Sequence, residues 1–155
     1  MGVKLLNLSK DDLYLISNKV LDIAKKNGAT ASEVELSVSS GKTISTRMGA
    51  LETIELNNGK SLSTTIFFGQ HQGIASTSDF SDDALESCVK AACQIAKYTA
   101  EDKAFGLADP SLYSKDVKDL KIYNSYFDSQ ELMIQKVLEC EDYALSFDSR
   151  ITNSE

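Results

Sequence analysis

A long stretch of strand-forming sequence, residues 31–69, sets the architecture that this chain can adopt. Its first part, "ASEVELSVSS", places Val34, Leu36 and Val38 on one face, which predicts a half-buried strand. Its second part, "GKTISTRMGALETIELNNGKSLSTTIFFG", is typical of a long hairpin. We expect the hairpin turn at "NNG", as a three-residue loop with Gly59 in the left-handed region.

This hairpin register gathers most of the apolar side chains on one face. The expected face comprises Met48, Ala50, Ile54, Leu56, Leu62, Ile66 and Phe68. Glu52 and Thr64 interrupt it, and Gly49 is expected to mark a bulge that re-aims the strand. Gly69 and Gly73 bracket "QHQ", which indicates a second turn followed by a short strand.

Helical periodicity begins before the strands. Ser9 and Asp12 have the spacing of a capping box. The helix that begins there is expected from about Lys10 to Asn27, with Gly28 just past its end.

Two further helices are expected after the strands. One begins near Asp79 or Ser81, and the other follows Asp128 or Ser129. Residues 99–127 between them show no periodic pattern and are expected to form a long irregular connection, a kind of segment that is often functional. The apolar stripes of the two helices comprise Leu85, Cys88, Ala92, Ile95 and Ala96, and then Met133, Val137, Cys140, Ala144 and Phe147.

The order of these elements defines the fold class. A helix, several antiparallel strands and then two helices predict an α+β fold. We expect an antiparallel, curved sheet of about four or five strands, with three main helices mainly on one face.

The charge and composition exclude several classes of protein. A net charge of −7 argues against a duplex nucleic-acid binder, because such proteins need a basic face. No segment has the length and apolarity of a signal peptide or a membrane span. Three widely spread cysteines fit reduced thiols better than a disulfide framework. These observations predict a soluble cytoplasmic protein that binds neither nucleic acid nor membranes.

His71 is the one histidine of the chain, and it is the natural candidate for a catalytic base. Ser76 and Ser78 are the nearby candidate nucleophiles, but nucleophilic catalysis also needs a third group that orients the base. His71 lies at an expected turn between two glutamines, and the Gly-x-Ser-x-Gly signature is absent. We therefore predict a structural role for His71 and no catalytic residue in this chain.

The cysteines do not have the spacing of a metal site. Cys88 and Cys93 lie five positions apart on one expected helix, so their side chains point roughly 140° apart. Cys140 belongs to another element, and a single histidine rules out a His-Glu-x-x-His motif. Buried or half-buried reduced thiols are the better interpretation, and no metal ligand is expected.

The acidic residues Asp79, Asp82 and Asp83 have part of the spacing of a calcium loop, but the glycine and the final glutamate of that loop are missing. Helix capping accounts for all three acids. The polar strand "SLSTTIF" fits a solvated sheet face better than a ligand site, and the residues that bind any ligand stay unknown at this point.

Several segments together resemble the N-terminal region of the PmbA/TldD family. They are "GATASEVELSVSSG", "STRMGALETIEL", the helix start from Ser76 to Ser81, "IAKYT", "GLAD" and "RITNSE". The resemblance covers nearly the whole chain in colinear order. The family consists of peptide-maturation proteases that are also described as modulators of DNA gyrase.

The resemblance implies a division of labour between two kinds of subunit. Members similar to TldD carry a zinc-binding His-Glu-x-x-x-His motif in a later C-terminal domain. Members similar to PmbA (TldE) lack it and act as the partner subunit of a heteromeric protease for unfolded peptides. By resemblance, residues 1–150 form a non-catalytic N-terminal domain without its own cofactor, and residues 151–155 begin the connection to a C-terminal domain. Zinc would belong to the TldD-like partner.

Two alternatives stay open. The chain is a stand-alone protein- or peptide-binding module if the irregular segment 99–127 forms a contact surface by itself. A self-sufficient hydrolase would require His71 and Ser78 to be essential, and this is the interpretation that the sequence supports least.

Overall fold

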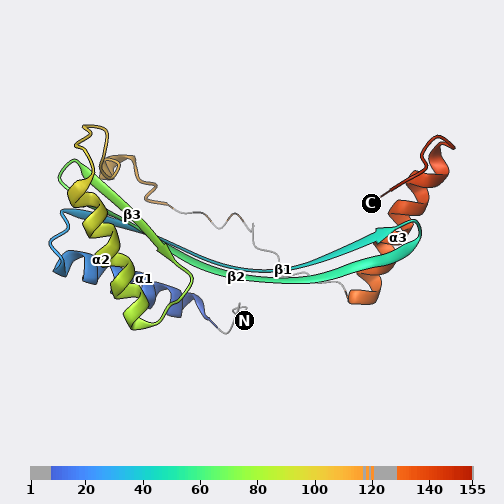
Figure 1. Cartoon of the computed structure of the whole chain (residues 1–155), viewed down its shortest axis with the longest axis horizontal. Helices are drawn as coiled ribbons and strands as arrows, with labels where there is room; N and C mark the ends of the chain where they lie inside the picture. The colour runs from blue at the N-terminus through green and yellow to red at the C-terminus, as the bar shows by residue number, and fades with distance from the viewer. Residues whose placement is uncertain (1–7, 117, 119, 121–128, 155) are drawn as a thin grey trace. The chain divides into compact units, whose positions relative to one another are not determined.

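The computed structural model describes residues 8–116, 118, 120 and 129–154 of the chain (Figure 1). The elements are α1 (Lys10–Lys26), β1 (Ala31–Arg47), β2 (Ala50–Phe68), β3 (His71–Thr77), α2 (Asp82–Tyr98), the short 3-10 helix η1 (Pro110–Leu112) and α3 (Gln130–Phe147). The sheet has the order β1-β2-β3, and β2 and β3 are antiparallel. The predicted α+β class is confirmed, with three strands in the described residues where four or five were expected.

The chain forms two compact units, and each is built from two stretches of sequence. Unit 1 comprises Met1–Ser39 and Gly59–Asp119, and unit 2 comprises Ser40–Asn58 and Leu120–Glu155. Both units contain part of β1 and part of β2.

Unit 1 contains every buried apolar side chain of the described residues. Its core brings α1, α2 and β2 together through Val20, Ala24, Leu62, Ile66, Leu85, Val89, Ala92 and Cys93. Val34 and Leu36 of β1 pack against this core, as the alternation in the sequence predicts. Each of the large buried side chains contributes about 1.5–3 kcal/mol by leaving water. Helices α1 and α2 therefore share the sheet face that carries Leu62 and Ile66 (Figure 1).

The helix starts follow the predicted caps. Ser9 and Asp12 form the expected capping box, in which the Ser9 hydroxyl accepts from the Asp12 N–H at 3.1 Å. Such a cap contributes about 1 kcal/mol. Ser81 is the N-cap of α2 but makes no capping bond with its side chain. Ser129 caps α3 by accepting from the Leu132 N–H, whereas Asp128 lies outside the described residues.

The predicted turn at "NNG" is wrong. Strand β2 runs without interruption through residues 57–59, and Gly59 is not in the left-handed region. The chain turns instead at Met48 and Gly49, whose φ angles are 51° and 77°. Two successive residues with positive φ give the turn a twist that matches the right-handed twist of the flanking strands. The tight turn is therefore formed by the dipeptide "MG", and not by "NNG", where the asparagines predict it.

The misplaced turn also changes the expected apolar face. Leu62 and Ile66 are buried as predicted, but Met48 is 56% and Leu56 is 70% exposed. Thr64 does not interrupt the buried face: it is fully buried, and its hydroxyl donates to the Glu33 carbonyl at 3.3 Å. A threonine can enter a core when its hydroxyl finds such an acceptor.

Glu52, which interrupted the expected apolar face, lies in the exposed part of β2. Its carboxylate is 3.9 Å from the guanidinium of Arg47 across the hairpin. The glutamate is therefore a solvated partner of a cation rather than a misplaced core residue.

The second hairpin is tighter than expected. β2 and β3 pair from Leu62↔Thr77 to Phe68↔His71, which leaves only Gly69 and Gln70 in the turn. Gly73 belongs to β3 rather than to a turn. A Cβ at Gly73 would come within 2.1 Å of the Ala92 carbonyl oxygen, so glycine is needed for the close approach of α2 to the sheet.

Helices α2 and α3 differ from the predicted stripes at a few positions. Ile95 is 47% and Phe147 is 75% exposed, and Cys140 is exposed as well. Val89 and Cys93 fill the buried face of α2 instead, because that face is rotated slightly from the predicted stripe. Residues 99–116 are irregular apart from η1, as expected, and the remainder of the predicted connection includes residues outside the described part.

Candidate interaction surfaces

His71 ties two elements of unit 1 together. It is half-buried at the start of β3, not at a turn tip, and its Nδ1 lies 2.8 Å from the Thr99 carbonyl oxygen just after α2. Ser76 lies five residues further along β3, which is about 16 Å at 3.3 Å per residue. The structure therefore does not bring His71 and Ser76 together. Ser78 follows the end of β3 and is exposed.

The three thiols are in two different environments. Cys88 and Cys93 are buried in unit 1, and Cys140 is exposed on α3. Burial raises the pKa of the Cys88 thiol, and it also raises the pKa of Cys93 despite the nearby Lys97. Neither buried thiol is therefore activated as a nucleophile. Among the described residues, no three His, Cys, Asp or Glu side chains are grouped to hold a metal ion, so no step through zinc is assigned to them.

The acids at the start of α2 have local partners. The Asp79 carboxylate accepts from the Ser81 N–H at 2.9 Å, and this hydrogen bond lowers the Asp79 pKa. Asp82 forms an ion pair with Lys19 of α1. Asp79 and Asp82 thus have structural roles near the helix start, but neither caps it: the N-cap of α2 is Ser81, and Asp82 and Asp83 lie in the first turn, where acids are expected.

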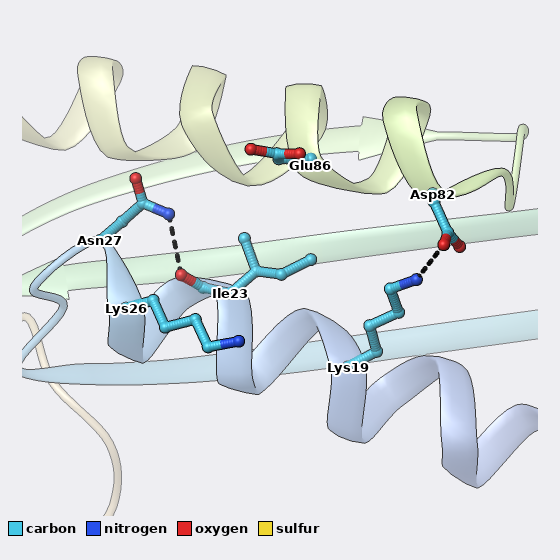
Figure 2. A pocket seen from close by; sticks show the side chains of 6 residues that line it. All are labelled: Lys19, Ile23, Lys26, Asn27, Asp82 and Glu86. Carbon is cyan, nitrogen blue, oxygen red and sulfur yellow. Dashed lines mark hydrogen bonds and ion pairs between the residues drawn. The ribbon is translucent and has the colours of Figure 1, made fainter.

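A shallow pocket of about 310 Å³ lies between α1 and α2 (Figure 2). The Lys19–Asp82 ion pair closes one end, and the Asn27 side chain donates to the Ile23 carbonyl at the other. Glu86, on the α2 side, is paired with Lys90, and the charge-assisted hydrogen bond lowers the Glu86 pKa. The pocket mixes both signs of charge and contains no nucleophile, so it fits a solvated seam between helices.

A second groove of about 410 Å³ lies between the start of β1 and the irregular segment. It is lined by Ser32, Glu33, Gly106, Leu107, Ala108 and Tyr113. Leu112 is 76% exposed beside Tyr113, at 50%. The irregular segment therefore presents apolar side chains to solvent next to an edge strand.

Unit 2 has a polar centre instead of an apolar core. Among its described residues, only Thr46 and Glu141 are buried. One Glu141 carboxylate oxygen accepts from the Gly49 N–H at 2.9 Å, and the other accepts from the Ser154 hydroxyl. The carboxylate thereby joins α3, the hairpin turn and the segment after α3.

Hydrogen bonds lower the pKa of Glu141. The Ser154 hydroxyl has the largest effect, and the backbone N–H groups of Gly49 and Met48 and the Thr46 side chain act in the same direction. The carboxylate thus stays ionised and occupies a site made of donors, much as an anion binds in a nest of N–H groups.

Comparison with known proteins identifies the family. Residues 32–96 match the family model described as PmbA/TldA metallopeptidase domain 1. The Metalloprotease PmbA homolog of Haemophilus influenzae is 37% identical over 150 residues, which cover 97% of this chain and 33% of the relative. The chain carries the first domain of the PmbA/TldD family. Metalloprotease PmbA of Escherichia coli O157:H7 is 37% identical over 131 residues, with 84% of this chain and 28% of the relative covered.

Solved structures agree with the family assignment. A crystal structure from Bacteroides thetaiotaomicron, named for a modulator of DNA gyrase, has a TM-score of 0.82 at 28% identity and covers 94% of this chain and 33% of that one. TldE from Thermococcus kodakarensis has a TM-score of 0.68 at 15% identity over 86% of this chain and 30% of its own, a likeness that shows the fold alone. This PmbA/TldD domain spans about a third of the length of the curated relatives it matches.

Sequence reasoning missed the central residue of unit 2 in this PmbA/TldD domain. Glu141 lies in the middle of the helical sector that also contains Val137, Leu138 and Ala144. A carboxylate inside an apolar sector is a recognisable signal for a buried anion with dedicated donors. In the described part of the domain, no helix is long and apolar enough to cross a bilayer.

Proposed function

We propose that this chain is the N-terminal, non-catalytic domain of a PmbA (TldE)-like subunit of a heteromeric zinc metalloprotease that processes or degrades unfolded peptides. The observation that carries the proposal is the colinear match of 97% of the chain to a Metalloprotease PmbA homolog at 37% identity. In this proposal, residues 1–150 form the domain, and residues 151–155 lead into a C-terminal domain. The protein works in the cytoplasm, and zinc belongs to a TldD-like partner subunit.

The exposed part of the hairpin supports a role in assembly. All residues of β2 from Ala50 to Ser61 are exposed, and they include Leu51, Ile54 and Leu56. A two-stranded ribbon is marginally stable in water by itself, so apolar side chains on such a ribbon favour contact with further protein. Sheet edges can also bind extended peptides through backbone hydrogen bonds, which suits a protease for unfolded chains of varied sequence.

The test uses the full-length protein and the TldD-like subunit from the same genome. We expect the two to co-purify, and we expect cleavage of an unstructured peptide only when both are present. A zinc chelator should abolish the cleavage and leave the full-length protein folded by circular dichroism. If the two proteins do not associate, the proposal is contradicted.

A stand-alone binding module is the second candidate, and the exposed apolar side chains of the irregular segment beside β1 favour it. Leu107, Leu112 and Tyr113 are exposed on one segment, which is a composition suited to protein contact. The intact mass of the endogenous protein separates the two candidates. A mass near 16.9 kDa favours the module, and a considerably larger mass favours the domain of a subunit.

A further inference from the structure

Strand β1 forms one edge of the sheet, because β2 is its neighbour in the order β1-β2-β3. The Thr64 hydroxyl of β2 donates to the Glu33 carbonyl, so this carbonyl points toward β2. Successive residues of a strand direct their backbone groups to alternate sides, so Ser32, Val34 and Leu36 direct their N–H and C=O groups to the outer side. None of the described helices and loops makes a backbone hydrogen bond to these three residues. The outer edge of β1 therefore offers a row of backbone donors and acceptors.

Two grooves border this outer edge, and all the residues that line them belong to unit 1. One, of about 310 Å³, lies between α1 and β1, and the other is the groove of about 410 Å³ between β1 and the irregular segment. No residue of β2 lines either groove, which places both on the outer side of β1. Together they follow β1 from Ser32 to Leu36, about 16 Å at 3.3 Å per residue. Such an edge accepts a strand rather than a helix, because a helix has already bonded most of its own N–H and C=O groups.

The face of β1 that is turned toward α1 is apolar. Val34 and Leu36 are half-buried and pack against the core of unit 1. Leu13 and Tyr14 of α1 line the opposite wall of the groove. Lys10 is the one charged residue that lines it, and its ammonium lies 5.7 Å from the centre of the Tyr14 ring. An apolar side chain therefore fits this groove, whereas a second cation there would be repelled.

The opposite face of β1 is acidic. Glu33 and Glu35 alternate with the apolar residues and are exposed, and neither carboxylate has an ion-pair partner within the described parts of the chain. Side chains directly opposite each other on neighbouring strands attract when their charges are opposite and repel when they are alike. A strand beside β1 should therefore carry lysine or arginine on this face, and the groove that Glu33 shares with Tyr113 can take the aliphatic stem. A second copy of the same edge would place acid against acid.

We infer that the outer edge of β1, from Ser32 to Leu36, binds an extended peptide segment as an added antiparallel strand, with apolar side chains facing α1 and basic side chains beside the two glutamates. The antiparallel direction is that of the β2–β3 pairing, and it is slightly more stable per residue than the parallel one. The inference rests on the proposed function for the source of the peptide, an unfolded chain that the protease receives. It adds the binding edge and the sequence pattern that this edge prefers.

The first experiment changes the peptide and leaves the protein unaltered. The probe is a fluorescein-labelled peptide of about eight residues in which valine and lysine alternate, and fluorescence anisotropy measures its binding to the full-length protein alone. Binding should weaken at least about tenfold when glutamate replaces lysine, or when the same residues are arranged in pairs instead of alternately. Methylation of the valine backbone N–H groups should weaken binding by about 100-fold, because these groups face β1 in an antiparallel pair, and methylation of the lysine backbone N–H groups should not.

The second experiment reverses the charge of the edge. Glu33→Lys with Glu35→Lys should weaken binding of the valine–lysine peptide at least about tenfold and strengthen binding of the valine–glutamate peptide. The control is Glu55→Lys with Asp142→Lys, which changes the net charge equally at two exposed acids of unit 2. The control should keep the preference for the valine–lysine peptide, since general attraction of a basic peptide to an acidic protein is then the same in both variants.

The third experiment truncates the walls of the two grooves. Tyr14→Ser with Tyr113→Ser removes one ring from each groove and should weaken binding about tenfold. The matched control is Tyr98→Ser with Tyr143→Ser, because these rings are 91% and 72% exposed away from both grooves. Circular dichroism checks that every variant is folded.

The outcomes separate the inference from the proposed function. If the full-length protein does not bind the valine–lysine peptide, the inference is overturned, because the edge is then covered by the same chain. Equal binding of the valine–lysine and valine–glutamate peptides overturns it, and so does any other response to N-methylation. Co-purification with the TldD-like subunit tests the proposed function in a separate assay. Co-purification without peptide binding at β1 overturns the inference alone, whereas no co-purification contradicts the proposed function and leaves the peptide result valid.

Discussion

Gly73 has the tightest packing of any glycine in the described structure. A Cβ there would lie 2.1 Å from the Ala92 carbonyl oxygen and 2.4 Å from the Ala96 nitrogen, and both are backbone atoms of α2. We expect Gly73→Ala to lower the free energy of unfolding by at least about 1–3 kcal/mol, because the helix has to move away from β3. Urea unfolding measures the change. The control is Gly41→Ala, where nothing lies within 4 Å of the new Cβ, and an equal loss in both variants would contradict this explanation.

Glu141 makes the stability of unit 2 depend on pH. Its pKa is lowered from the ordinary value of 4.5 in the folded chain, chiefly by the Ser154 hydroxyl. A carboxyl whose folded pKa is depressed stabilises the fold above its unfolded pKa, and this stabilisation is lost as the pH falls through the folded value. Glu141→Gln should therefore be less stable than the unaltered protein at pH 7, and the difference should shrink as the pH falls below about 4.5.

Thermal unfolding followed by circular dichroism between pH 3 and pH 7 is the measurement for Glu141→Gln. Glu55→Gln is the control, since Glu55 is exposed on the hairpin of the same unit. A difference between Glu141→Gln and the unaltered protein that stays constant over this pH range would mean that the carboxylate charge plays no part in joining α3 to the turn.

The hairpin between β1 and β2 turns at Met48 and Gly49, and methionine is not a residue that this type of tight turn favours. Met48 has a φ of 51°. For residues other than Gly, Asn and Asp, this left-handed conformation costs about 1–2 kcal/mol. Asn-Gly is the favoured pair for two successive positive φ angles. Met48→Asn should therefore stabilise the protein by up to about 1 kcal/mol, and Gly49→Ala should destabilise it by a similar amount. Denaturant unfolding of both variants tests the assignment, and opposite signs are required.

The same turn shows what the sequence can and cannot predict about the elements. The capping box at Ser9, the alternation in β1 and the extents of α1 and α2 depend on neighbours in sequence, and they were predicted nearly to the residue. The hairpin turn was placed at "NNG" because its local preference is stronger than that of "MG". The actual turn is held by Glu141, 92 residues away from Gly49, and no local pattern contains such a contact.

For the candidate surfaces, too, some features could be predicted from the spacing of residues in the sequence and others could not. The buried thiols of Cys88 and Cys93 and the structural role of the acids at Asp79 and Asp82 could be predicted from spacing. The exposure of Phe147 could not, because a 3–4 spacing of apolar residues does not say whether one face of the helix or two are apolar.

The molecule as a whole should not be equally stable throughout. Unit 1 has a core of fully buried apolar side chains, whereas the described residues of unit 2 bury only Thr46 and Glu141. Local stability follows buried apolar contact, so backbone amides of α3 should exchange with solvent deuterium faster than those of α1 and α2. Hydrogen exchange with mass spectrometry resolves the helices separately. Equal protection of α2 and α3 in this chain would contradict the expectation.

The division of the chain into units has one consequence for its covalent integrity. The backbone passes from one unit to the other three times, between residues 39 and 40, 58 and 59, and 119 and 120. A single nick at one of these crossings leaves the two units tethered by the other two. A nick in the exposed hairpin between residues 40 and 58 gives two polypeptides that each contribute to both units, so the cut chain comes apart only if the packing of both units is lost.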